Sequence, residues 1–167
     1  MNETRKLVFM GLLVAAALAL SFVESFLPPL VLPGAKLGLA NIVTVVALYA
    51  LPRPRDAAMV LAARVLLGGV FAGGATLVYS ASGAALSFCV MLLLQKAGRF
   101  GIVPVSAAGG FFHNAGQLVA ASVTTSSSAL ALAYLPPLGG LGLLAGGFVG
   151  IVAREAVKKF SWAQAGM

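Results

Sequence analysis

Long apolar runs, interrupted by short groups of charged, proline or glycine residues, constrain this chain more than any other feature. Hydrophobic residues make up 60% of its 167 residues, and charged residues only 9%. A soluble domain carries about 25% charged residues, so this chain could not cover a surface that faces water. A run of about 20 apolar residues can cross a bilayer as a helix. We therefore expect an all-α integral membrane protein, a six-transmembrane-helix bundle forming one domain over residues 1–167.

Helix-breaking residues set the expected boundaries of these helices. Pro28–Pro29 ends the first helix, Pro52–Arg55 breaks the second from the third, and Gly73–Gly74 ends the third. Ser126–Pro137 is expected to be a polar, proline-marked connection. The N-terminal run could be a cleavable signal peptide, but its length and the later runs favour a retained first helix. The expected helices cover about 5–26, 36–51, 56–71, 80–96, 105–125 and 138–159.

The basic residues fall on one side of a six-span topology. Lys36 is alone on the other side. The four groups on the first side are Arg5 and Lys6; Arg53 and Arg55; Lys96 and Arg99; and Arg154, Lys158 and Lys159. The positive-inside rule then predicts a multi-pass protein of the inner (cytoplasmic) membrane with both termini in the cytoplasm. Because the net charge of +7 is scattered in short groups, we expect no nucleic-acid partner.

The residue inventory argues against several kinds of chemistry. Cys89 is the single cysteine, so neither an internal disulfide nor a cysteine metal site can form. The GxxxxGK[ST] spacing of a P-loop is absent, including from the glycine-containing run Pro33–Asn41. We expect no catalytic residue, no metal and no cofactor. Any ATP-driven transport would need ATPase subunits supplied by other chains.

Polar residues at membrane depth are the candidates for ligand binding. Burying a polar side chain in the membrane costs free energy, so each is expected to have a hydrogen-bond partner or a functional role. At a rise of about 1.5 Å per residue, they fall in the middle and outer half of the bilayer. His113 and Gln117, four residues apart, share one face of a helix. The candidate ligand-binding residues are Lys36, Asn41, Arg64, His113, Asn114 and Gln117.

The chemistry of these residues favours an anionic or carbonyl-rich small molecule that enters from the outer side. Lys36 and Arg64 are positively charged, and an arginine can hold a carboxylate or phosphate through paired hydrogen bonds. The alternative is a structural role, in which Glu24 and Arg64 neutralise each other and the amides tie helices together.

Small residues at four-residue spacing form two smooth stripes. One comprises Gly11, Ala15 and Ala19, and the other comprises Gly142, Gly146 and Gly150. Such stripes let helix backbones approach closely in lipid. Two interpretations stay open for them, namely packing within the bundle and a docking face for another membrane subunit.

Four stretches resemble a known family: Glu24–Pro28, Pro33–Thr44, Arg64 and His113–Gln117. Together they are similar to the Gx transporter family, whose members are often labelled heptaprenyl diphosphate synthase component I. The similarity covers about residues 8–157. It implies a relation to the S components of energy-coupling factor transporters, which bind vitamins and similar small molecules from the outside with a six-helix membrane domain.

The same resemblance implies partners and roles. S components couple to a transmembrane scaffold subunit and a pair of ATPases, and an Ala-xxx-Ala stripe on their first helix contacts the scaffold. Ala15 and Ala19 fit that spacing, with Gly11 on the same stripe. The family's binding residues would map onto the six candidates named above.

The synthase label can be tested against the residues. Prenyl chain elongation uses clustered aspartates to hold magnesium and diphosphate. Asp56 is the single aspartate among four acidic residues, so no DDxxD-type site can form. We therefore expect no synthase catalysis. A non-catalytic accessory role in prenyl diphosphate or quinone synthesis is the alternative to transport, and a stand-alone channel or carrier is a third possibility.

Overall fold

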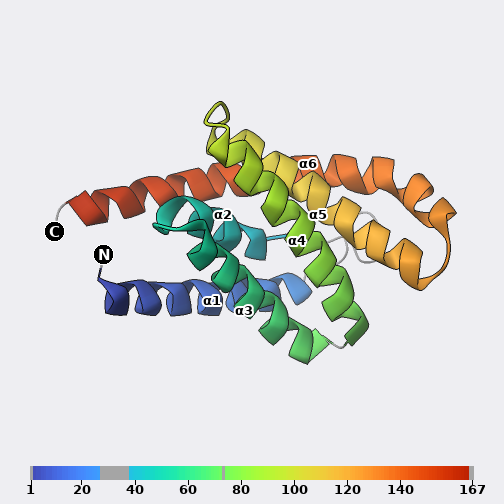
Figure 1. Ribbon diagram of the computed structural model, residues 1–167, viewed down its shortest axis with the longest axis horizontal. Coiled ribbons are helices and arrows are strands. Elements are labelled where there is room, and N and C mark those ends of the chain that lie inside the picture. Colours follow the sequence, from blue (N-terminus) through green and yellow to red (C-terminus); the bar gives the residue numbers. More distant parts are fainter. Residues whose placement is uncertain (1, 27–37, 73, 166–167) are drawn as a thin grey trace.

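The computed structural model of the chain describes residues 2–26, 38–72 and 74–165. All regular secondary structure in these ranges is helical. Six helices follow one another in these ranges (Figure 1). They are α1 (Glu3–Ser25), α2 (Ala40–Ala50), α3 (Pro54–Ala72), α4 (Gly74–Lys96), α5 (Ile102–Thr124) and α6 (Ser128–Ala165). The expected all-α class is confirmed.

The largest difference from the expected boundaries lies in α6. The helix begins at Ser128, not near residue 138, and it contains Pro136 and Pro137. The expected connection between residues 126 and 137 was therefore mostly wrong. A proline removes one backbone donor and disfavours a helix in water. In an apolar environment, unwinding the whole segment would leave many more backbone groups unsatisfied, so the helix continues through both prolines.

Two other helix starts also differ. α4 begins at Gly74, not near residue 80, and α2 begins at Ala40, not near residue 36. At the start of α1 the Oδ1 atom of Asn2 accepts a hydrogen bond from the backbone N–H of Arg5, at 3.1 Å. This side-chain cap satisfies one of the free donors of the first turn and explains why α1 starts before residue 5.

The helices form two groups of three. α1, α2 and α3 pack against one another, while α5 packs against both α4 and α6. The two groups join where α3 contacts α4 and where α2 contacts α6. α2 lies between α1 and α6 (Figure 1). Its residues from Val43 to Leu48 are all buried, as expected for a helix covered on every side.

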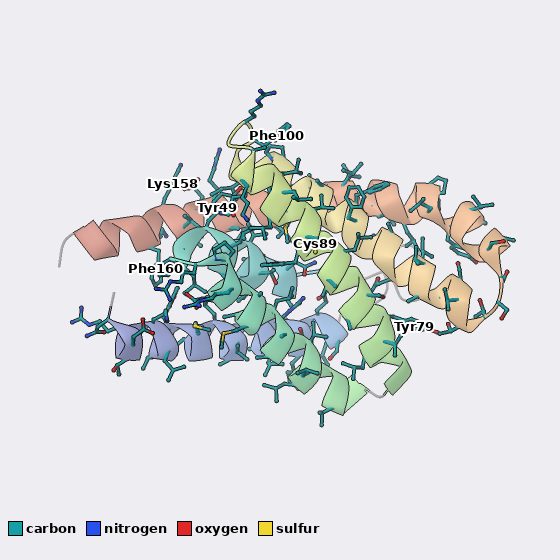
Figure 2. The ribbon with its side chains drawn as sticks, viewed as in Figure 1. Tyr49, Tyr79, Cys89, Phe100, Lys158 and Phe160 are labelled. Atoms are coloured by element: carbon teal, nitrogen blue, oxygen red, sulfur yellow. The ribbon has the colours of Figure 1, made fainter. Side chains whose placement is uncertain are left out.

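Contacts between helix ends show that successive helices alternate in direction. The Lys6 and Asp56 side chains, at the starts of α1 and α3, form an ion pair at 3.9 Å. Gln95 near the end of α4 donates to the Leu48 carbonyl near the end of α2, at 2.8 Å. Figure 2 shows Phe160 of α6 facing α1, where its ring lies 4.2 Å from that of Phe9.

The basic residues consequently gather at one end of the bundle, which we call the basic end. It is formed by Arg5, Lys6, Arg53, Arg55, Lys96, Arg99, Arg154, Lys158 and Lys159. At the opposite end, the hydroxyls of Tyr79 in α4 and Thr124 in α5 share a hydrogen bond of 3.0 Å. Figure 2 shows Tyr79 and Phe100 at the two ends of the α4 region.

Among the residues that the structure describes, three helical segments are long and apolar enough to cross a membrane: Glu3–Ser25, Thr76–Lys96 and Leu132–Phe160. α2 is apolar but shorter. α3 and α5 contain the polar residues Arg64 and His113–Gln117, which lower their hydropathy. Large apolar side chains also point outward from the bundle, with Val70 78% exposed and Leu132 77% exposed. A surface of this kind aggregates in water and is stable in lipid, so these features indicate a membrane protein.

The glycine stripe of α6 packs within the bundle. A methyl group built at Gly146 would lie 2.5 Å from the Ser106 carbonyl oxygen of α5, and one at Gly110 would clash with the Gly142 carbonyl oxygen. The Ser106 hydroxyl donates to the Gly146 carbonyl at 2.6 Å. Of the two interpretations of this stripe, the contacts support close packing of α5 on α6.

Candidate ligand-binding site

Arg64 and Asn41 meet between α3 and α2. The Nη2 atom of Arg64 donates a hydrogen bond to Oδ1 of Asn41, at 3.3 Å. The Nε atom of Arg64 is buried and has no hydrogen-bond partner among the described residues. Arg64 therefore has one donor engaged and another available inside the bundle. Two of the predicted ligand-binding residues are thus in direct contact.

Glu24 joins this pair from α1. Its side chain is only 7% exposed. Its Oε1 atom accepts a hydrogen bond from the backbone N–H of Gly38, at 2.5 Å, and its carboxylate interacts electrostatically with Arg64. Glu24 is not among the six predicted binding residues. The signal for it in the sequence was the possibility that it neutralises Arg64.

Gly38 is the residue that makes the contact with Glu24 possible. Its φ is +73°, in the left-handed region where side chains other than glycine are strained. A methyl group there would also lie 3.1 Å from Nδ2 of Asn41. Glycine thus allows the chain to turn into α2 with its N–H directed at the Glu24 carboxylate.

His113 and Gln117 pack against α4 at Gly83. A methyl group at Gly83 would lie 3.2 Å from Cε1 of His113 and 2.8 Å from Cγ of Gln117. The His113 ring is hydrogen-bonded to the Gly83 backbone and interacts electrostatically with Arg64. Its Nδ1 atom is buried without a hydrogen-bond partner among the described residues. The two side chains share the face that their spacing indicates, and His113 lies near Arg64.

Asn114 lies elsewhere. Its Nδ2 atom donates to the Leu138 carbonyl of α6, at 2.6 Å. One residue advances a helix by about 100°, so Asn114 faces α6 while His113 faces α4. This contact supports the interpretation of Asn114 as a tie between helices. The remaining candidate, Lys36, lies outside the described residues.

We call Glu24, Gly38, Asn41, Arg64 and His113 the Arg64 cluster. It draws on four parts of the bundle: the end of α1, the start of α2, the middle of α3 and the middle of α5. Because α1 ends and α2 begins at the end opposite the basic end, the cluster extends from the middle of the bundle toward that opposite end. It combines one carboxylate, one guanidinium, one imidazole and one amide, which can bind a polar small molecule.

The described residues contain no group of three or more His, Cys, Asp or Glu side chains that could hold a metal ion.

The small-residue stripe of α1 has a different position from that of α6. Gly11, Ala15 and Ala19 are all exposed, and a methyl group at Gly11 would meet nothing within 4 Å. Large apolar residues flank the stripe, with Leu12 63% and Phe22 66% exposed. The stripe thus faces outward, and its role as a partner interface stays a prediction.

These features define a class: an all-helical protein with helices suited to a membrane and a polar cluster between them. The chain belongs to the family described as heptaprenyl diphosphate synthase component I, whose sequence pattern matches residues 13–156. This match confirms the family label that the motifs indicated. No curated protein and no solved structure shows significant similarity to the chain.

Proposed function

We propose that this protein is the substrate-binding membrane subunit of a small-molecule uptake transporter, resembling the S components of energy-coupling factor transporters. The observation that carries the proposal is Arg64, an arginine inside an apolar bundle whose buried Nε donor has no partner within the described ranges of the chain. A charged side chain at membrane depth is costly and typically marks a substrate pathway. Asn41 and His113 supply further polar groups beside it.

In this proposal all six helices cross the inner membrane, with both termini in the cytoplasm. The alternating helix directions and the basic end support it, because positively charged residues favour the cytoplasmic side. The Arg64 cluster then opens toward the outer side, from which the ligand is captured.

The protein is not an enzyme in this proposal, and its partners supply the energy. The exposed stripe Gly11, Ala15 and Ala19 is the proposed contact with a transmembrane scaffold subunit. Small residues on an outward face let a partner helix approach closely where lipid provides no hydrophobic drive. ATPase subunits bound to that scaffold would power release of the ligand into the cytoplasm.

The test of ligand capture is native mass spectrometry of the full chain purified in mild detergent. Arg64→Lys keeps the positive charge beside Glu24 but removes the planar guanidinium and its Nε donor. We expect a small molecule to copurify with the wild type and the R64K variant to retain roughly tenfold less, the change that a lost interaction of about 1.4 kcal/mol produces. Arg99→Lys at the exposed basic end is the matched control and should retain the wild-type amount. Equal retention by R64K and the wild type would refute the assignment of this site.

The family's description supports a second candidate, a non-catalytic accessory protein of prenyl diphosphate synthesis. The proteins that copurify with the chain separate the two candidates. A membrane scaffold with ATPases supports transport, whereas a soluble prenyl synthase supports the accessory role.

A further inference from the structure

A buried carboxylate lies near Arg64, and this restricts the ligand. Glu24 is 7% exposed and accepts a hydrogen bond from Gly38, which lies beside the Asn41 side chain that Arg64 contacts. Its negative charge acts on Arg64 across the interior of the bundle. We infer that the part of the ligand that contacts Arg64 is an uncharged, amide-like group, and not a carboxylate or a phosphate. This inference rests on the proposed function and names the substrate class of the same site.

The position of Glu24 is held independently of any ligand. Its carboxylate accepts a hydrogen bond from the backbone N–H of Gly38, whose left-handed φ lets the chain turn into α2. A ligand carboxylate brought to Arg64 would therefore join a second carboxylate in a medium of low dielectric constant. Two negative charges close together in such a medium repel strongly, and one guanidinium cannot neutralise both.

Two hydrogen-bonding atoms of the Arg64 cluster are complementary to the two polar groups of an amide. The Nε–H of Arg64 is a buried donor without a partner in the part of the chain that the structure describes, so it needs an acceptor. Nδ1 of His113 is likewise buried without a partner among those residues, and a neutral imidazole that donates from its other nitrogen accepts at Nδ1. An amide carries a carbonyl acceptor and an N–H donor without net charge. It can satisfy both atoms without adding a second negative charge near Glu24.

The sequence alone favoured an anionic or carbonyl-rich ligand because Lys36 and Arg64 are both basic. At Arg64 the buried Glu24 carboxylate favours the carbonyl-rich alternative over the anionic one. An anionic end of the same ligand would have to bind away from this pair.

The experiment uses benzamide and benzoate, two probes of nearly equal size that differ in charge. Binding to the detergent-purified full chain is measured by saturation-transfer NMR. We expect the wild type to bind benzamide at least fivefold more tightly than benzoate. Glu24→Gln keeps an acceptor for Gly38 but removes the charge, so the E24Q variant should reverse this preference. Glu3→Gln, at a site whose side chain is 82% exposed, is the matched control and should behave as the wild type.

The double variant E24Q/R64M removes both charges and guards against misfolding of E24Q. It should fold and lose the benzoate binding that E24Q gains. Two results would overturn the inference. One is that the wild type binds benzoate more tightly than benzamide and that R64K or R64M weakens this benzoate binding. The other is that E24Q shows no gain in benzoate binding. Absence of a copurified ligand in the wild type would instead count against the proposed function, while the reversal in E24Q would still establish Glu24 as the counter-ion.

Discussion

Adjacent polar residues on one helix can have separate tasks, as His113 and Asn114 show. His113 faces α4 and approaches Arg64, whereas Asn114 donates to the Leu138 carbonyl of α6. The Asn114 amide thus adds a hydrogen bond between α5 and α6, just after the two prolines of α6.

Asn114→Ala should therefore lower the stability of the bundle without changing ligand capture. A hydrogen bond between membrane helices contributes about 0.6–1.7 kcal/mol, so a modest fall in the thermal unfolding midpoint in detergent is expected. Asn41→Ala is the comparison, because it removes the partner of Arg64 and should reduce the copurified ligand. If N114A lost the ligand but unfolded like the wild type, Asn114 would belong to the binding site instead.

At the scale of helices, the contrast between α6 and α1 depends on which face each helix buries. Both carry small residues at four-residue spacing, which permits close approach of another backbone. α6 uses its stripe within the chain, where Gly142 and Gly146 contact α5. α1 turns its stripe outward. Spacing alone cannot distinguish these cases because both orientations place the small residues on one face.

Gly146→Ala should destabilise the protein because its added methyl group would lie 2.5 Å from the Ser106 carbonyl oxygen of α5. The two helices would have to separate, at a cost of roughly 1–3 kcal/mol. Gly147→Ala on the same helix meets nothing within 4 Å and should be neutral or slightly stabilising. Thermal unfolding of both variants in the same detergent measures the difference. Equal midpoints for the two would argue against the close α5–α6 packing.

At the scale of the whole molecule, alternation of helix direction gathers the charges that the sequence distributes over four separated groups. Ion pairs, hydrogen bonds and ring contacts at the basic end connect helices that lie far apart along the chain. The Arg64 cluster extends from the middle of the bundle toward the opposite end. In the proposed orientation, the basic end faces the cytoplasm and the Arg64 cluster faces the outside.

Cysteine labelling tests this orientation. In a Cys89→Ala background, Arg99→Cys and Thr125→Cys place one thiol at each end, both at exposed positions. A membrane-impermeant thiol reagent applied to intact cells should label the T125C variant at once and the R99C variant only after the membrane is permeabilised. The opposite pattern would invert the proposed orientation, and labelling of both in intact cells would contradict a six-span arrangement.

The helical class, the helices suited to a membrane, the basic groups and the family could all be predicted from the sequence, because they depend on composition and local order along the chain. Most helix ends were close to expectation where a cap or a Pro-Arg-Pro break acts locally. The start of α6 differed most, since its passage through Pro136 and Pro137 depends on the apolar surroundings of the backbone. Which polar residues meet follows from the packing of the helices against one another. Helix rotation brings Glu24 to Arg64 and turns Asn114 toward α6, because side-chain direction changes by about 100° per residue and a helix's rotation is set by its neighbours.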